Sequence, residues 1–219
     1  GGPIVQNRAF FFGDHEGYRQ TRKVTGISTI PTAANASGIL PVAVRDPRTG
    51  ITYDAGTPVP MTTFARKVLS SLPTPTSAGT SNNYTILQEF TNDTDKAGGK
   101  VDLQIAPGLS MFGRYGWRDL NTFDQPGIPL PAGGDGNGTI YARSKQLALG
   151  MTWVQSPTAL LEVRFGYGTT SAGKNPPGLG SASALDQFGL AGLPSDPRIA
   201  GGLPTQSIIG FTTLGRQAT

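Results

Sequence analysis

The sequence of 219 residues contains no cysteine and only one histidine, His15. Without cysteine, the chain can form neither a disulfide framework nor a thiolate metal site. A single histidine also excludes metal motifs built from two histidines, and any serine triad would depend on His15 alone. No other constellation of residues supports an enzyme, and we expect no enzymatic activity, no metal site and no cofactor.

Long apolar runs are also absent. No stretch approaches the roughly 20 apolar residues that a helix needs to cross a membrane. No charged start followed by an apolar run indicates a signal peptide. Because the sequence begins abruptly at Gly1-Gly2-Pro3 and stops at Thr219, we expect it to be an excerpt from a longer protein.

Charged residues are few, with 18 Lys and Arg against 14 Asp and Glu. The basic residues are scattered singly or in short pairs such as Arg22-Lys23, so no basic tract indicates a nucleic-acid partner. Only 37% of the residues are hydrophobic, whereas 31 are glycine and 18 are proline. This balance is typical of a loop-rich, all-β protein.

Residues 142–170 contain the clearest pattern, two strands joined at Ser156-Pro157-Thr158. On each arm, bulky apolar residues alternate with small, polar or charged ones, and a period of two indicates strands. Eight apolar residues fall on one face: Leu147, Leu149, Met151, Trp153, Leu161, Val163, Phe165 and Tyr167.

The two arms have a definite register, because opposed residues of an antiparallel pair point to the same side of the sheet. A loop centred on Pro157 places the eight apolar residues opposite one another. On the other face, Glu162 and Arg164 lie opposite Thr152 and Gly150. A sheet with one apolar face and one small, charged face suits either a soluble sandwich or a barrel whose outside touches lipid.

The remaining strands follow from the same alternation. We predict strands near residues 8–22, 99–106, 109–120, 143–155 and 158–170, with a possible sixth near 206–214. A hairpin centred on Gly108 would place Asp102 opposite Arg114. Such a cross-strand ion pair contributes about 0.2 to 1 kcal/mol.

Three long connections, rich in glycine, proline and small polar residues, separate the strands: residues 25–96, 121–141 and 171–204. In the first, helical spacing of apolar residues between a cap at Thr62 or Thr63 and a stop at Pro73 predicts one short helix. Because long connections alternate with tight turns, all the long loops lie at one end of an antiparallel sheet. Outer-membrane barrels have this asymmetry.

Aromatic residues lie near both ends of the apolar strands. Trp153 precedes a tight turn, whereas Tyr115, Trp117 and Tyr167 lie toward the long loops, as two girdles at membrane interfaces require. The predicted fold is therefore all-β. It is an open, antiparallel, up-and-down meander that forms part of a large transmembrane β-barrel with long irregular loops.

The face opposite the apolar residues would line the inside wall of such a barrel. The candidate residues that face the lumen or a plug are Asp102, Arg114, Arg118, Glu162 and Arg164. Phe112, Val154 and Leu160 share this face, although apolar side chains are not typical of a water-filled pore. They fit a plug that packs against the wall.

Four segments resemble the TonB-dependent outer-membrane receptors of the Oar-like kind. They are GGPIVQNRAFFFGDHEGYRQ at the start, GGKVDLQI at residues 98–105, FGRY at 112–115 and QLALGMTWVQSPTALLEVRFGY at 146–167. The first segment is the most specific and resembles the passage from the plug into the first barrel strand. His15 stands where an aromatic residue is expected.

The resemblance implies a barrel of about 22 strands in the bacterial outer membrane. Its partners would be outer-membrane lipid, its own plug and remaining strands, and TonB, which the N-terminal segment of the intact receptor contacts. This chain would then be a structural barrel segment, and the intact parent would import or export a substrate.

An alternative of another class remains open from the residues alone. The chain could be a secreted, soluble, β-rich adhesion or carbohydrate-binding module whose apolar face is buried by a second sheet. The two hypotheses differ in what covers the eight apolar residues. An uncovered face favours the barrel.

Overall fold

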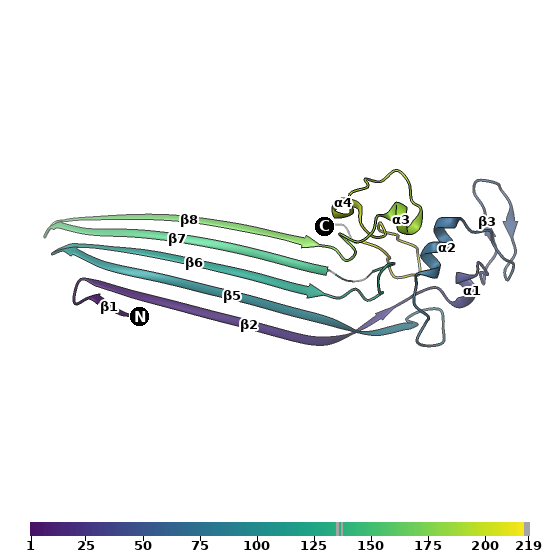
Figure 1. Ribbon diagram of the computed structural model, residues 1–219, viewed down its shortest axis with the longest axis horizontal. Helices are drawn as coiled ribbons and strands as arrows, with labels where there is room; N and C mark the ends of the chain where they lie inside the picture. Colours follow the sequence, from purple (N-terminus) through teal and green to yellow (C-terminus); the bar gives the residue numbers. More distant parts are fainter. Residues whose placement is uncertain (135, 137, 217–219) are drawn as a thin grey trace. The chain divides into compact units, whose positions relative to one another are not determined.

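The computed structural model describes residues 1–134, 136 and 138–216. Its main element is one antiparallel sheet of six strands, which neighbour one another in the order of the chain (Figure 1). These strands are β1 (Gly2–Val5), β2 (Ala9–Ser28), β5 (Tyr84–Ala106), β6 (Leu109–Asp124), β7 (Gly138–Ser156) and β8 (Ala159–Asn175). The predicted all-β meander is confirmed.

Tight turns join consecutive strands at one end of the sheet. β5 and β6 meet at Pro107 and Gly108, and Gly108 has a φ of +79°, a left-handed conformation that glycine adopts without strain. Pro157 and Thr158 join β7 to β8. The long connections start from the opposite strand ends, because the strands alternate in direction.

The strands are longer than the sequence indicated. β2 continues to Ser28 and β5 already starts at Tyr84, so both ends of the predicted loop 25–96 are strand. These ends carry polar residues on both faces, for example at 91–95, and therefore lack the apolar alternation that identifies a strand. The other strands likewise extend into the predicted loops 121–141 and 171–204.

The possible sixth strand near residues 206–214 is wrong. An isolated antiparallel bridge joins Gln206 to Leu214, and no extended strand forms between them. Leu214 is buried in a hydrophobic cluster formed by the loops. The apolar residue that suggested a strand therefore contributes to loop packing, and the additional strand of the sheet is β1, at the other end of the chain.

The predicted short helix is confirmed as α2 (Thr63–Ser70). The hydroxyl of Thr62 accepts a hydrogen bond from the backbone N–H of Ala65 at 3.1 Å, and the helix ends before Pro73. The loops also contain α1 (Ala33–Ala36), α3 (Ala184–Phe188), α4 (Pro197–Ala200) and the hairpin of β3 (Val44–Arg45) and β4 (Thr52–Tyr53). None of the helices in the described ranges is long and apolar enough to cross a membrane.

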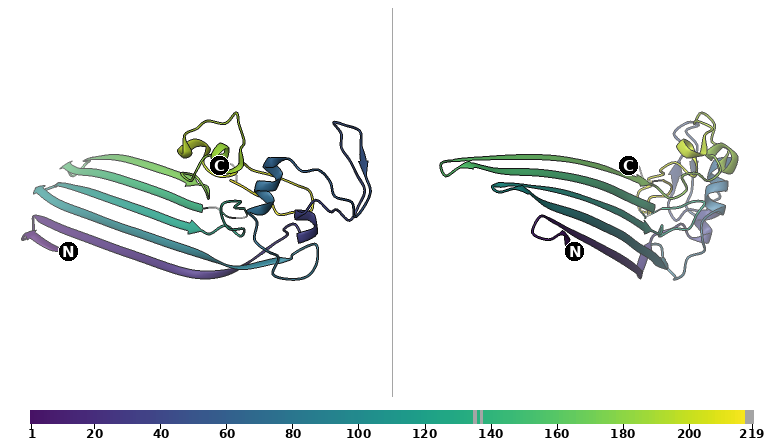
Figure 2. Two further views of the ribbon diagram at one scale, coloured as in Figure 1. Left: turned by 45° about the vertical axis from the view of Figure 1, so that its right-hand side comes forward. Right: turned by 60° about the vertical axis from the view of Figure 1, so that its left-hand side comes forward.

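The chain divides into two compact units. The first contains the turn-side parts of the strands, which lie side by side as a single layer in Figures 1 and 2: Gly1–Thr21, Thr91–Thr122 and Ile140–Gly173. The second contains the long connections and the remaining parts of the strands. Its hydrophobic core consists of Ile30, Val68, Tyr84, Ile128, Ala132, Phe188, Leu203 and Leu214.

Candidate functional site

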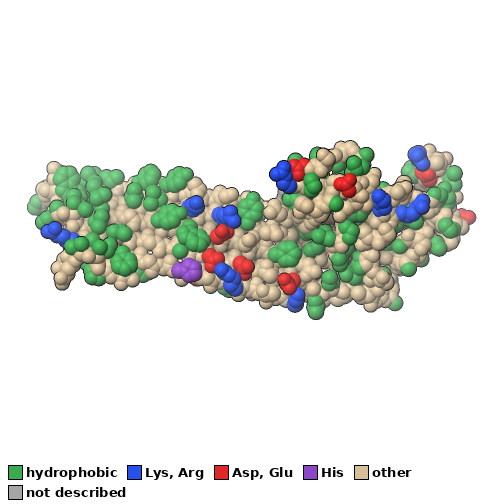
Figure 3. Space-filling model, viewed as in Figure 1, with side chains coloured by type: hydrophobic (Ala, Val, Ile, Leu, Met, Phe, Trp, Pro, Cys, Tyr) green, Lys and Arg blue, Asp and Glu red, His purple; other side chains and the backbone are tan. Residues whose placement is uncertain are grey.

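One face of the sheet is apolar near the tight turns, where hydrophobic side chains gather in Figure 3. Leu149 and Met151 of β7 and Val163 and Phe165 of β8 line one shallow hollow, together with Met111 of β6. The structure thus brings together half of the predicted apolar face. The same alternation along β7 and β8 continues with Leu147, Trp153, Leu161 and Tyr167.

None of these eight side chains is buried. Six are exposed, from 40% of the residue surface at Trp153 to 61% at Tyr167, while Leu147 and Met151 are half-buried. Among the described residues, the only other sheet is the two-stranded β3–β4 hairpin. The second sheet that a sandwich would require is therefore absent from the described part of the chain.

Two glycines indicate how β7 and β8 lie against each other. A Cβ atom added at Gly168 would lie 3.9 Å from Cγ of Gln146, and one added at Gly173 would meet the hydroxyl of Tyr141. Both contacts agree with a pairing centred on Pro157. The register predicted from the alternation is therefore compatible with the side-chain positions.

A row of ion pairs follows the apolar region on the same face (Figure 3). Nη2 of Arg19 in β2 lies 2.8 Å from each carboxylate oxygen of Asp95 in β5. Nε of Arg143 in β7 lies 3.2 Å from Oδ2 of Asp119 in β6. Asp119 and Arg143 are in phase with the apolar residues of their own strands, so the polarity of one face changes along the strand direction.

The change from apolar to charged side chains along this face limits the apolar band to a length suited to a membrane. A tilted transmembrane strand needs about 9 to 11 residues, and β7 has apolar residues at alternate positions only between Lys145 and its turn. β2 and β5 continue beyond the row, where Nζ of Lys23 lies 2.8 Å from Oε2 of Glu89. The strands are therefore longer than their apolar parts.

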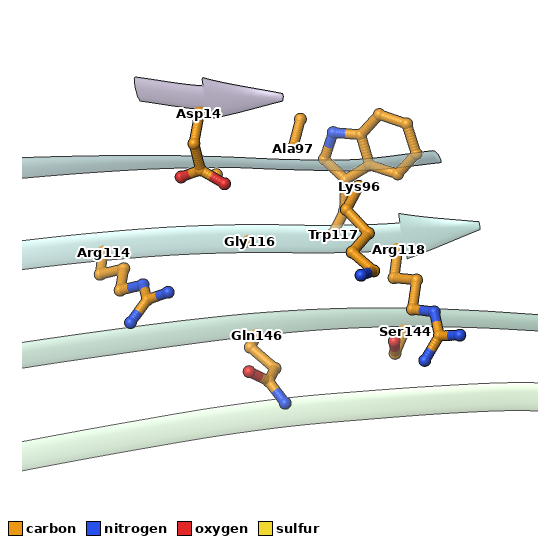
Figure 4. A pocket seen from close by; sticks show the side chains of 10 residues that line it. Asp14, Lys96, Ala97, Arg114, Gly116, Trp117, Arg118, Ser144 and Gln146 are labelled. Carbon is orange, nitrogen blue, oxygen red and sulfur yellow. The ribbon is translucent and has the colours of Figure 1, made fainter. Parts of the chain in front are cut away.

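The opposite face of the sheet contains a polar hollow of about 330 Å³ (Figure 4). Arg114 and Arg118 of β6 project into it on the two sides of Gln146, which belongs to β7. Lys96 of β5 and Asp14 of β2 also line it. Two of the five predicted inner-face residues, Arg114 and Arg118, thus share one site.

The two arginines of this hollow differ from its lysine. Nζ of Lys96 lies 3.0 Å from Oε1 of Glu16 and forms an ion pair. Arg114 and Arg118 are exposed, and within the described ranges their guanidinium groups have neither a hydrogen bond nor an ion pair. Among the described residues nothing occupies their donors, which are therefore free to bind a further group.

The predicted ion pair between Asp102 and Arg114 is wrong. Oδ1 of Asp102 lies 2.7 Å from Nζ of Lys100, two residues away on the same strand and on the same face. Asp102 lines a separate hollow of about 300 Å³ with Phe112 and Gly150. A nearer partner along β5 therefore replaces the predicted partner across the sheet.

The other two predicted inner-face residues, Glu162 and Arg164, bind each other. Nε of Arg164 donates to Oε1 of Glu162 at 2.8 Å along β8. Neither lines the hollow of Arg114 and Arg118. The predicted inner face therefore contains three separate polar groups.

Sequence reasoning missed Lys96 and Gln146 as residues of the hollow. Lys96 lies in the predicted loop 25–96. However, the alternation that includes Asp102, continued toward the N-terminus of β5, puts Lys96 on the same face as Asp102. Gln146 carries no charge, and its relation to Arg114 depends on which strands are neighbours. In the part of the chain that the structure describes, no three His, Asp or Glu side chains form a candidate metal site.

A single-layer antiparallel sheet whose apolar face is uncovered and whose other face is polar is the wall of a transmembrane β-barrel. Residues 1–219 match the family described as outer membrane beta barrel domain, and the chain belongs to this family. It is a barrel segment of a protein of the bacterial outer membrane. No curated protein and no solved structure matches the chain. The alternative of a secreted, soluble module does not agree with this location.

Proposed function

We propose that the chain is a structural barrel segment of a TonB-dependent transporter of the Oar-like kind, whose intact parent moves a substrate into or out of the cell. The observation that most supports a membrane wall is the uncovered apolar face, which is followed along the strands by a row of ion pairs. The resemblance of residues 1–20, 98–105, 112–115 and 146–167 supports the transporter class. We propose no catalytic role and no cofactor.

The two faces of the sheet would have different surroundings. We propose that the eight apolar residues of β7 and β8 contact outer-membrane lipid. Asp102, Arg114, Arg118, Glu162 and Arg164 would then face the lumen or a plug. Phe10, Val154 and Leu160 are exposed, and in the alternation of their strands they belong to the inner face, which supports a plug that packs against the wall.

The edges of the sheet support closure by further strands. β1 and β8 are the outermost of the six strands and leave backbone donors and acceptors unpaired. In the hydrocarbon core each unpaired group costs several kcal/mol, so spanning sheets close into barrels. The resemblance implies about 22 strands, and we propose that the other strands belong to the parent receptor.

The lipid-facing assignment is tested by single cysteines in the full-length protein, since this chain has none of its own. A fluorophore at Leu147→Cys, Leu149→Cys or Val163→Cys should be quenched by lipids that carry a nitroxide. The matched variants Gln146→Cys, Ala148→Cys and Thr152→Cys lie on the other face and should be quenched several-fold less. Equal quenching at odd and even positions would refute a wall with one face in lipid.

The TonB-dependent class has a separate test. Cross-linking in living cells, followed by purification of the full-length protein, should yield an adduct with TonB. An unrelated outer-membrane barrel from the same cells serves as the control and should yield none. A protein that reaches the outer membrane but gives no adduct above this control would contradict the assignment to TonB-dependent transporters and leave the barrel wall intact.

A further inference from the structure

We propose that the hollow lined by Arg114 and Arg118 is an oxyanion-binding site, which takes a carboxylate or phosphate group on the inner wall. The inference rests on the proposed orientation of this face toward the lumen. It does not depend on transport or on TonB. The site comprises both arginines together with Gln146 and Ser144 of β7.

The donors of the site come from two neighbouring strands. Arg114 and Arg118 are four residues apart on one face of β6, so their Cα atoms are separated by about 13 Å along the strand. Figure 4 shows both side chains reaching toward β7, with the amide of Gln146 between them and Ser144 beside Arg118. Each guanidinium presents a planar set of N–H donors that matches a carboxylate or phosphate.

The two arginines are distinguished from other cations of this face by their lack of partners. Lys96, Lys100 and Arg164 each form an ion pair within the sheet. Arg114 and Arg118 form none within the described ranges. A face that neutralises these three cations but leaves Arg114 and Arg118 open on either side of an amide has the charge complementarity that an oxyanion requires.

Asp14 is the one carboxylate among the residues that line the hollow. It enters from β2, beside Gly98, where an added Cβ would lie 2.8 Å from Oδ1 of Asp14. Gln146 lies on the opposite side of the hollow (Figure 4). An oxyanion would therefore bind near β6 and β7, and the carboxylate of Asp14 would weaken its binding by repulsion.

The test is a calorimetric titration of the full-length protein in detergent micelles at low ionic strength, with citrate and with inorganic phosphate as probes. Wild type should bind a probe saturably, and added salt should weaken the binding. Arg114→Gln combined with Arg118→Gln should weaken it at least tenfold, and the corresponding double lysine variant several-fold. Arg164→Gln, which removes a paired cation of the same face outside the hollow, should leave it unchanged.

Asp14→Asn should change probe affinity in the opposite direction and strengthen binding several-fold. A misfolded protein cannot produce this result. A heat-dependent shift in gel mobility verifies that each variant is folded. Equal weakening by Arg164→Gln and by the double glutamine variant would overturn the site, because it would show a general charge effect. If no variant selectively changes probe binding or melting temperature, while lipid still quenches the fluorophore more at Leu147→Cys than at Gln146→Cys, this site alone is refuted and the lipid-facing wall stands.

The oxyanion could also be an acidic side chain of the protein itself, and the same variants separate this source from a free solute. In that case wild type would bind neither probe, but the double glutamine variant would have a lower melting temperature, whereas Arg164→Gln would not. That outcome supports the oxyanion site with an internal occupant. No binding and no selective change in melting temperature would overturn the proposal.

Discussion

Replacing Leu149 by arginine should lower the free energy of unfolding of the lipid-inserted barrel by about 2 to 4 kcal/mol. Leu149 lies within the apolar hollow of β6, β7 and β8, with 43% of its surface exposed on the face that we assign to lipid. A guanidinium at this depth loses its hydration and gains no protein partner. The measurement is a urea titration of folding into lipid vesicles, followed by gel mobility.

Ala148→Arg is the matched control for this prediction. Ala148 is the preceding residue of β7, so its side chain lies on the other face of the same strand at nearly the same depth. The added charge would enter the lumen, beside a wall that already contains Arg114 and Arg118, and should change stability by less than about 1 kcal/mol. A loss as large as that of Leu149→Arg would show that both faces of β7 meet an apolar environment.

In the half of the sheet near the tight turns, the alternation of apolar and polar residues was sufficient to predict which residues share a face. Leu149, Met151, Val163 and Phe165 are bulky and in phase, because one side must be apolar while the other remains polar. Gly108 marked a turn because its positive φ requires a flexible residue. These features are local, and local features can be read from a sequence.

The strand ends near the long connections could not be predicted from alternation. Arg19 and Asp95 occupy the same face as the apolar band, but both faces are polar at this level and no period of two in hydrophobicity remains. Strand ends such as Ser28 and Tyr84 therefore looked like loop. What holds them in the sheet is pairing with neighbours far along the chain, a property that the pattern of one segment does not contain.

The candidate site shows the same limit. Alternation placed Arg114 and Arg118 on one face, and the structure brings them into one hollow. The predicted partner of Arg114 was wrong because alternation specifies a face and not which of several neighbours a long side chain selects. Asp102 could reach Lys100 on its own strand, and a contact along the strand does not depend on the register between strands.

The loops form a core of their own, which their glycine- and proline-rich composition did not indicate. Ile30, Ile128, Phe188 and Leu203 are almost completely buried there, although they come from three different connections. Phe64 of α2 packs edge-on against Phe188, with ring centroids 6.5 Å apart. The second unit is therefore packed around specific side chains, and its local stability can be measured.

Asn83→Ala should reduce the local stability of this loop core by about 2 to 6 kcal/mol. Asn83 is completely buried, and its side chain binds both backbone groups of Ile30: Oδ1 accepts from the N–H and Nδ2 donates to the carbonyl, each at 2.9 Å. Alanine would leave both groups buried without partners, at a cost of about 1 to 3 kcal/mol each. Amide exchange near Ile30 should accelerate roughly 30- to 20,000-fold in mass spectrometry.

Asn82→Gly is the control for the buried asparagine, because it removes the side chain of the adjacent exposed residue. Asn82 has a φ of +49°, a conformation that glycine adopts without strain, so this variant should leave exchange near Ile30 nearly unchanged. Asn83→Asp should accelerate exchange at least as much as Asn83→Ala, since it keeps the acceptor for the Ile30 N–H but buries a carboxylate against the Ile30 carbonyl. If Asn83→Ala accelerates exchange no more than Asn82→Gly does, the paired hydrogen bonds do not stabilise the loop core.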